Sequence, residues 1–420
     1  MKIKHVDAYQ VFDSRGNPTL EAEVELENGI KGRAIVPSGA STGRTEALEL
    51  RDGDPSLFGG QSVFQAIRNV REKIAPALSG KDVRNQSHLD ARMIDLDGTT
   101  DKSNLGANAI LGASMAIARA SAHAQKLPLF QSLTEKGGHL LPLPEIQIIG
   151  GGAHSNGRID IQDFMILCTG AAGYGECLEM TYNVYRQCGL LLKKKGKLAG
   201  VADEGGYWPE FDSNEEVFQI LMESIEQAGY MAGRDIHLSL DIAASELYSD
   251  GKYHLKLDGE SLTPAQFYKL ISGWCENYPI RSIEDPFEES DVENWKKLTA
   301  AFGDNLQIVG DDLFTTDVRR VHKGKEQNLA NSVLIKLNQI GTVTETIDCI
   351  LQTREFGWQP VVSARSGETE DPFIAHLAVA THAGQLKVGS FSRSERMVKW
   401  NEVIRIERKL GNRATFTGII

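Results

Sequence analysis

The stretch LQIVGDDLFTTDVRRVHKGKEQNLANSVLIKLN, from Leu306 to Asn338, decides the fold. An apolar run ends at Gly310, two aspartates follow, a polar stretch comes next, and a second apolar run begins near Ser332. Short apolar runs of this kind are typical of buried strands, and the longer polar stretch between them is typical of a helix. The sequence therefore predicts one unit of strand, loop, helix and next strand.

Similar apolar runs occur on both sides of this unit. From the third onward they recur about every 25 residues, the length of one strand, loop and helix. The runs cover 236–242, 280–284, 306–310, 332–337, 360–363 and 386–389. The repeat predicts an α/β fold in which residues 140–420 form a (β/α)8-type barrel. In such barrels the active site lies where the strands end, so the residues at those ends are candidates for function.

The N-terminal part has a different pattern. From Ile3 to Val36 apolar and polar residues alternate, with turn signals at 13–18 and 28–29, which predicts an antiparallel meander. A loop of small residues, 37–43, follows, and helical patterns cover 62–78 and 105–125. Residues 1–135 are therefore expected to form an α+β domain.

Composition excludes several classes of protein. The net charge of −12 argues against a nucleic-acid-binding protein, which needs a basic face. The sequence contains no apolar run long enough for a membrane span and no secretory signal pattern. Its five cysteines form no CxxC pair, so we expect reduced thiols and a cytoplasmic location.

Acidic residues stand at the ends of three consecutive predicted strands. HLSLD ends in Asp241, SIED contains Glu284 and the adjacent Asp285, and IVGDD ends in Asp311 and Asp312. Carboxylates gathered on one rim repel one another unless a cation binds them, and an all-oxygen set suits Mg2+. The alternative is that each acid only caps the helix that follows it.

Two lysines are candidates for chemistry. Lys336 lies inside the apolar run VLIKLN, where burial and a nearby cation would lower its pKa and make it a general base. The alternative is a lysine that extends to the surface. Lys399, in SRSERMVKWNE, is a candidate for binding a substrate carboxylate, although its helical spacing fits a surface lysine equally well.

Further candidates lie in glycine-rich or turn-rich stretches. Glu204 precedes two glycines in VADEGGYWP and has no obvious helix to cap, so we expect an acid catalyst there. In VVSARSGETED, Arg365 and Ser366 follow a strand and can form an anion cradle. The alternative is that Ser366 or Thr369 caps the helix that begins near Pro372. His154 and Asp163 are either site residues or structural.

Eleven motifs together resemble the enolase family and occur in that family's order across nearly the whole chain. They are DSRGNPT, SGASTG, EALELRDGD, MIDLDGT, GANAILG, DEGGYWP, SIEDPFEESD, GDDLF, LIKLNQIG, RSGETED and SRSER. The resemblance implies an enolase-type modified, partly antiparallel (β/α)8 (TIM-like) barrel that begins ββαα, with an N-terminal α+β capping domain. It also implies two Mg2+ ions, a small phosphorylated or phosphono carboxylate as substrate, and a homodimer or higher homo-oligomer.

The resemblance also implies roles for individual residues. Lys336 matches the base that takes the C2 proton, and Glu204 matches the acid that helps the C3 hydroxyl leave. The remaining matches are Asp241, Glu284 and Asp311 for the tighter metal, Ser41 for the second metal together with substrate, Asp163 for catalysis, Lys399 for the substrate carboxylate, His154 for substrate binding, and Arg365 and Ser366 for the phosphate.

Five positions depart from the family pattern. SHRSGET has become SARSGET at Ala364, and QEF has become QDF at Asp163, whose side chain is one methylene shorter. INGGEH has become IGGGAH, with Gly150 and Ala153, and DEGGYAP has gained Trp208. These changes are expected to cluster in the pocket, at the end where the hydroxyl leaves.

The departures leave three functions open. The first is an enolase-family lyase that acts on a substrate other than 2-phosphoglycerate, for which phosphonate-biosynthesis enzymes such as carboxyphosphonoenolpyruvate synthase are the precedent. The second is an ordinary glycolytic enolase that tolerates the substitutions. The third is a catalytically silent binding or structural homologue, against which the retained Lys336 and Glu204 argue.

Overall fold

The computed structural model describes residues 1–40, 43–134 and 138–418. The chain begins with an antiparallel sheet of β1 (Ile3–Phe12), β2 (Pro18–Leu26) and β3 (Lys31–Ile35), in the order β1-β2-β3. The alternation of buried and exposed residues in β3 follows the period of a strand with one covered face. The predicted meander is confirmed.

Helices cover one face of this sheet. α1 (Phe64–Asn69), a π-helical turn η2 (Val70–Ile74) and α2 (Ala75–Leu78) follow one another without a break, as predicted. α3 (Gln86–Asp97), which was not predicted, precedes α4 (Ala107–Gln125). The small residues of α4 permit close packing, since a Cβ on Gly112 would lie 2.6 Å from the Leu20 side chain.

The rest of the chain forms a closed barrel of eight strands. Its strands are β5 (Leu143–Gly150), β6 (Asp163–Leu167), β9 (His237–Asp241), β13 (Ile280–Glu284), β14 (Gln307–Gly310), β15 (Ser332–Ile335), β16 (Gln359–Ser363) and β17 (Gln385–Ser390). They are hydrogen-bonded in this order, and β17 pairs with β5 to close the barrel. β6 is antiparallel to both neighbours.

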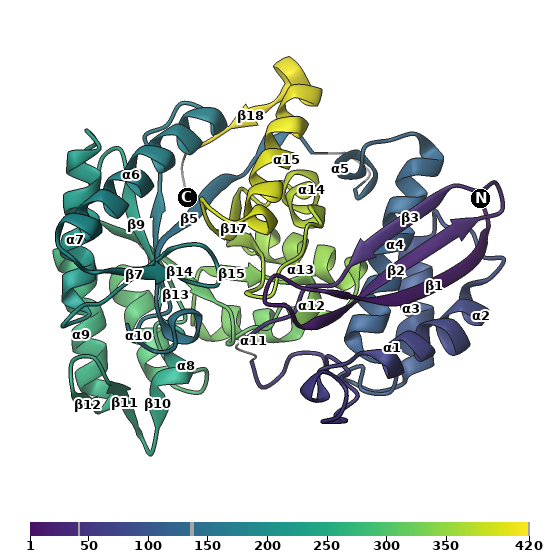
Figure 1. The fold of residues 1–420 in the computed structure, drawn as a ribbon, viewed down its shortest axis with the longest axis horizontal. Helices are drawn as coiled ribbons and strands as arrows, with labels where there is room; N and C mark the ends of the chain where they lie inside the picture. Colours follow the sequence, from purple (N-terminus) through teal and green to yellow (C-terminus); the bar gives the residue numbers. More distant parts are fainter. Residues whose placement is uncertain (41–42, 135–137, 419–420) are drawn as a thin grey trace.

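The barrel begins with two strands and two helices, because α6 (Tyr174–Lys194) and α7 (Glu215–Gln227) follow β6 before β9. The α/β class and the enolase-type barrel beginning ββαα are therefore confirmed. Figure 1 shows the N-terminal sheet, in purple, beside the barrel. The predicted boundary between 135 and 140 includes residues outside the described part of the chain and stays a prediction.

Further elements surround the barrel and the N-terminal sheet. They are η1 (Phe58–Gly60), α5 (Leu129–Ser132), β4 (Leu140–Leu141), η3 (Gly152–Ser155), β7 (Leu198–Val201), β8 (Tyr207–Pro209), α8 (Ala244–Leu247), β10 (Tyr248–Ser249), β11 (Lys252–Leu255), β12 (Glu260–Leu262), α9 (Pro264–Asn277), α10 (Val292–Phe302), α11 (Val318–Gln327), α12 (Leu337–Ile340), α13 (Val343–Glu355), α14 (Phe373–Ala380), α15 (Ser394–Leu410), η4 (Gly411–Arg413) and β18 (Thr415–Phe416).

Strand register places acidic residues at one level of the barrel. Asp163 on β6 lies opposite Asp241 on β9, and Asp241 lies beside Glu284 on β13. Side chains alternate between the two faces of a strand, so residues that share a register level point to the same side. The three carboxylates therefore meet at the end of the barrel where β9 and β13 terminate.

The N-terminal part covers this end of the barrel. Ser38 and Gly367 exchange two backbone hydrogen bonds, of 2.9 and 2.8 Å, so the loop after β3 pairs with the loop after β16. A Cβ on Gly367 would lie 2.6 Å from the Ser38 carbonyl oxygen, which explains why this position has no side chain. The contact brings the small-residue loop to the barrel mouth.

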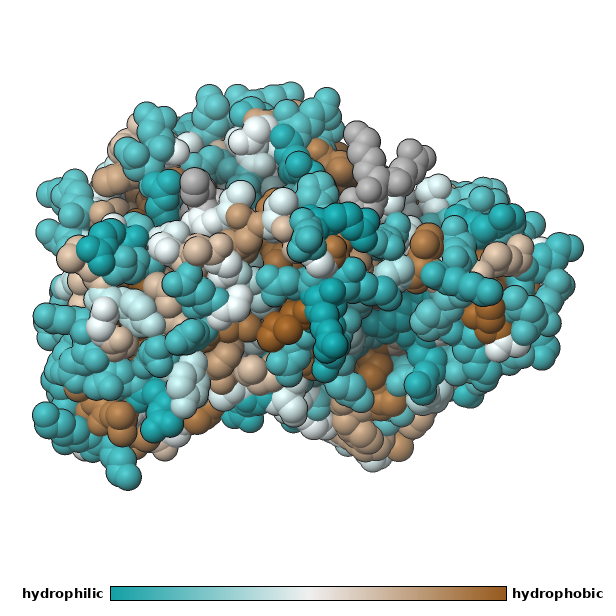
Figure 2. Space-filling view, turned by 90° about the horizontal axis from the view of Figure 1, so that it is seen from above, coloured by the Kyte–Doolittle hydropathy of each residue, from teal (hydrophilic) through white to brown (hydrophobic). Residues whose placement is uncertain are grey.

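Polar side chains cover most of the face shown in Figure 2, with apolar ones scattered between them. None of the helices in the described part of the chain has the length and apolar character needed to cross a membrane.

Candidate active site

A polar pocket opens at the barrel end that the N-terminal loop covers. It is lined by Ala40, His154, Gln162, Asp163, Glu204, Asp241, Lys336, Ser363, Ala364, Arg365, Ser366, Lys387, Val388 and Gly389. The fold thus brings together seven of the predicted site residues from six strand ends and loops. Ser41, predicted to bind the second metal, lies outside the described residues.

Asp241 and Glu284 form the predicted metal-binding end. Lys387 Nζ donates to Asp241 Oδ2 and to Glu284 Oε2, each at 2.8 Å. Burial first, and the nearby Asp241 carboxylate second, raise the pKa of Glu284 well above its usual range. Glu284 Oε1 is buried and has no hydrogen-bond partner among the described residues.

An orphaned carboxylate oxygen beside a second carboxylate is a site that a hard cation satisfies, since Mg2+ prefers oxygen ligands. The residues present therefore fit Mg2+. Among the described residues, two other groups have possible metal-ligand atoms that all lie within 4.8 Å of one another. One group is His154, Asp163 and Glu204, and the other is Asp285, Asp311 and Asp312.

Asp311 forms an ion pair with Lys336, which lines the pocket. Lys336 Nζ donates to Asp311 Oδ2, and Gln339 donates to Asp311 Oδ1 at 2.7 Å. Burial opposes the charge of the lysine, but the carboxylates of Asp311 and Glu284 outweigh it, so the pKa of Lys336 lies above its usual value. The sequence-based expectation of a lowered pKa is wrong for this arrangement, because the ion pair with Asp311 stabilises the ammonium form.

Asp285 ties two strand ends together. It follows Glu284 directly with a left-handed φ of +40°, and its carboxylate accepts hydrogen bonds of 2.9 Å from the backbone N–H groups of Asp311 and Asp312. A left-handed aspartate is strained and persists only where other contacts hold it. Asp285 is therefore an architectural residue that keeps the β13 and β14 ends in line.

His154 occupies the opposite side of the pocket between two acids. Its Nδ1 lies 3.2 Å from Asp163 Oδ1, and its Nε2 lies 4.0 Å from Glu204 Oε1. Burial disfavours the charged ring, but the carboxylates of Asp163 and Glu204 outweigh burial and raise the pKa of His154 to about 9. The histidine is therefore protonated at neutral pH, and the same ion pair lowers the pKa of Asp163 despite its burial.

Glu204 is presented by a tight glycine turn. Its carbonyl accepts a hydrogen bond of 2.9 Å from the Ser390 N–H, and Gly205 follows with φ +98°. A Cβ on Gly205 would lie 2.6 Å from Ser392 Oγ, so only glycine fits. The fully buried Arg396 places its Nη1 3.7 Å from Glu204 Oε1. The two glycines after Glu204 thus fix its direction into the pocket.

Arg365 and Ser366 line the side of the pocket nearest the N-terminal part. Arg365 Nη1 donates to Glu46 Oε2 at 2.9 Å and to Asn338 Oδ1 at 2.8 Å, while Ser366 Oγ accepts from the Ala40 N–H at 2.7 Å. Neither hydroxyl of the turn caps the next helix, because it is Asp371 Oδ1 that accepts from the Phe373 N–H at 2.9 Å. The capping alternative for Ser366 and Thr369 is wrong.

Lys399 does not face the pocket. Its side chain is 0% exposed, and its Nζ donates to the carbonyls of Thr369 and Glu395 and pairs with Glu368 Oε2 at 2.7 Å. The prediction that Lys399 binds a substrate carboxylate is therefore wrong, since its charge is used inside the scaffold. The lysine that lines the pocket is Lys387 on β17, which sequence reasoning missed.

The positions that depart from the family pattern are divided between pocket and periphery. Ala364 and Asp163 line the pocket, whereas Gly150 packs against Ala202 behind it. Ala153 is exposed and outside the lining, which corrects the expectation that all the changes cluster there. Trp208 stacks under Arg158, whose Cζ lies 5.2 Å from the ring centre.

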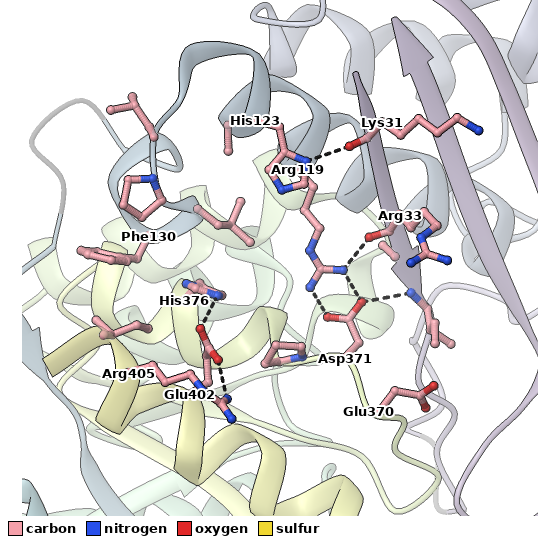
Figure 3. A pocket seen from close by; sticks show the side chains of 18 of the residues that line it. Lys31, Arg33, Arg119, His123, Phe130, Glu370, Asp371, His376, Glu402 and Arg405 are labelled. Carbon is pink, nitrogen blue, oxygen red and sulfur yellow. Dashed lines mark hydrogen bonds and ion pairs between the residues drawn. The ribbon is translucent and has the colours of Figure 1, made fainter. Parts of the chain in front are cut away.

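A larger cavity of about 1060 Å3 lies elsewhere, between β3, α4 and α15. Figure 3 shows Arg119 paired with Asp371 and His376 paired with Glu402 on its walls. Most of its charged groups form ion pairs with one another, and it contains none of the predicted catalytic residues. The barrel mouth therefore remains the candidate active site despite its smaller size.

Comparison with known proteins agrees with the geometry. The family model described as the enolase C-terminal TIM barrel domain matches residues 138–420, and the model described as the enolase N-terminal domain matches residues 3–133. Enolase 1 of Desulfitobacterium hafniense (strain Y51) is 53% identical over 418 residues, which cover 99% of this chain and 95% of that relative. With two matching domains and a full-length relative, the chain belongs to the enolase family and is a lyase of that family.

Proposed function

We propose that this protein catalyses the ordinary enolase reaction, in which 2-phosphoglycerate loses water to give phosphoenolpyruvate. The observation that carries the proposal is that Lys336 and Glu204 line one pocket from different parts of the barrel. A base and an acid on separate supports can act on two adjacent carbon atoms of one substrate. The relative named Enolase 1 favours this reaction over the phosphonate-type reaction expected from the sequence.

The proposed reaction uses the residues of the chain in two steps. Lys336 Nζ must first give up the proton that its ion pair with Asp311 stabilises. In its neutral form it accepts the C2 proton, and the electron pair of that C–H bond is delocalised into the substrate carboxylate. The C2=C3 double bond then forms as the C3–O bond breaks, and the departing hydroxide takes a proton from the Glu204 carboxyl group to leave as water. Arg365 and Ser366 would bind the phosphate.

Asp241, Glu284 and Asp311 would hold Mg2+, which supplies positive charge opposite the substrate carboxylate as negative charge develops there. Glu284 Oε1, which has no partner among the described residues, supports this assignment. Ser41 is proposed for a second Mg2+ shared with substrate. The protonated His154, 4.0 Å from Glu204, would stabilise that carboxylate after it has lost its proton.

A second candidate function rests on Ala364. Its methyl group lines the pocket where the family pattern has an imidazole, so the site has more room and one fewer titratable group. This observation favours an enolase-family lyase for another phospho- or phosphonocarboxylate. Ala364→His would then raise turnover of 2-phosphoglycerate by about a hundredfold or more, the usual contribution of one general acid or base.

The deciding experiment measures enol product by ultraviolet absorbance, using purified protein with Mg2+ and 2-phosphoglycerate. Turnover of about 1–1000 per second, the usual range of enzymes, is the expected result. Turnover at least a hundredfold below that range, with Mg2+ binding retained, would reject the ordinary reaction and favour the second candidate. A protein that binds no Mg2+ would be the silent homologue. The homo-oligomer and the cytoplasmic location stay predictions, the first testable by sedimentation.

A further inference from the structure

Gln147, on β5, connects Asp163 to the glycine turn that follows Glu204, although it does not line the pocket itself. Its Nε2 donates to Asp163 Oδ1, and its Oε1 accepts a hydrogen bond of 2.8 Å from the Gly206 N–H. The side chain is completely buried, and both ends of its amide are used. A buried amide with both ends satisfied has one orientation, so it fixes the distance between the groups that it joins.

The surrounding backbone leaves room for this side chain. A Cβ on Gly206 would lie 2.9 Å from the Gln147 amide carbon, and a Cβ on Gly150 would lie 3.2 Å from Gln147 Nε2. Real Cβ atoms essentially never approach as closely as 2.9 Å, so Gly206 has no room for a side chain beside Gln147. The two glycines are thus matched to a long amide at this point of the barrel.

One end of Gln147 contacts a residue that lines the pocket, and the other contacts the turn that presents one. Asp163 lies 3.2 Å from His154 Nδ1 and 3.6 Å from Lys387 Nζ, while Gly206 belongs to the turn that presents Glu204. A shift of Gln147 would therefore move Asp163 and Glu204 together. The length of the Gln147 side chain also sets how long the side chain at position 163 must be to accept its hydrogen bond.

We propose that Gln147 is a positioning residue whose length is matched to Asp163, so that the Gln147–Asp163 pair holds His154 and Glu204 in their reactive arrangement. The proposal rests on the proposed function for its kinetic consequences. An aspartate is one methylene shorter than the glutamate of the family pattern, and a glutamine is one methylene longer than an asparagine. The double change of Gln147→Asn and Asp163→Glu shortens one side chain by a methylene and lengthens the other by a methylene. The combined length of the two side chains that meet between positions 147 and 163 is therefore unchanged.

The experiment is a double-mutant cycle of wild type, Gln147→Asn, Asp163→Glu and the double variant. Each single change alters the reach by one methylene, so each is expected to lower kcat by about a hundredfold, the usual cost of a 1 Å misplacement. The double variant is expected to return to within about fivefold of wild type, on the same scale of geometric tolerance. A double variant no better than the worse single variant would overturn the proposal.

Two further variants separate positioning from packing. Gln147→Met keeps the volume and loses both hydrogen bonds, so kcat should fall by about tenfold or more while KM changes less than threefold, because the pocket wall stays in place. Gln307→Met, at the other end of the barrel, removes a comparable buried amide that bonds Gln385 at 2.9 Å and should leave kcat unchanged. A wild-type kcat in Gln147→Met would also overturn the proposal.

The same proteins distinguish failure of this proposal from failure of the proposed function. If the wild-type protein does not turn over 2-phosphoglycerate, the proposed function fails. The double-mutant cycle is then measured by the thermal unfolding of the four proteins. A melting temperature of the double variant that lies closer to wild type than to either single variant supports the length match. Additive losses of the two single changes would overturn it.

Discussion

His154→Gln is expected to lower the free energy of unfolding most at acidic pH and least near pH 9. In the folded protein the pKa of His154 is raised from 6.5 to about 9 by Asp163 and Glu204, against the effect of burial. A raised folded-state pKa gives stabilisation that is complete below the unfolded value and is lost as pH rises through the folded value. The stabilisation by His154 is therefore lost as the pH rises from 6.5 to about 9.

The magnitude follows from the size of the shift. A shift of about 2.5 pKa units at about 1.4 kcal/mol per unit corresponds to about 3 kcal/mol. The His154 side chain is 5% exposed, so solvent screens the two ion pairs only weakly. The difference in unfolding free energy between wild type and His154→Gln should thus be about 3 kcal/mol larger at pH 6 than at pH 9.

Urea unfolding of both proteins at pH 6, 7.5 and 9, without Mg2+, measures this difference. His237→Gln is the matched control, because burial and the nearby Arg281 lower the pKa of His237. A lowered histidine pKa gives stabilisation at high pH that is lost as pH falls, so the control should show the opposite trend. A His154→Gln penalty that does not change with pH would refute a protonated His154 between the two acids.

Three other changes test the packing and the charges of the site. Gly150→Asn should destabilise by about 1–3 kcal/mol, because a Cβ there would lie 2.6 Å from the Ala202 Cβ, and adding Ala202→Gly should recover most of the melting temperature. Lys387→Met leaves Asp241 and Glu284 without their ammonium partner, so it should lower the free energy of unfolding by about 3–5 kcal/mol in EDTA. The loss should be smaller in excess Mg2+, because a bound cation would replace the missing positive charge. An equal loss in both conditions would argue against a cation at these carboxylates. Lys399→Met should lower the melting temperature while KM changes less than threefold, whereas a large rise in KM would restore Lys399 to the substrate site.

Much of the fold could be predicted because its signals are local. The barrel strands from β9 to β17 are short apolar runs between polar stretches, and their register brought Asp241 beside Glu284 as the strand-end argument requires. The meander follows from alternation at period two. α3 has buried residues at only four of its twelve positions, so its apolar pattern is weak and it was not predicted.

Two site residues, Lys387 and Gln147, were not predicted from the sequence. Lys387 lies in the apolar strand QLKVGS, as Lys336 follows the apolar strand SVLI, so the argument applied to Lys336 could have found it. Gln147, in LPEIQIIG, is one polar residue in a buried strand, and its importance comes from Asp163 and Gly206 on other elements. The pKa of Lys336 depends on its pairing with Asp311, which spacing along the chain does not reveal.

The pairing of Arg365 with Glu46 has a consequence for folding. Arg365 is 3% exposed, and its carboxylate partner comes from the N-terminal part of the chain, 319 residues away in sequence. A barrel produced without residues 1–135 would have to bury this guanidinium without that carboxylate, a loss of about 3–5 kcal/mol for a broken buried pair. Such a loss is a large share of the stability of a typical domain. The barrel and its N-terminal cover should therefore melt in a single cooperative transition, and an excised barrel should be a poor folding unit.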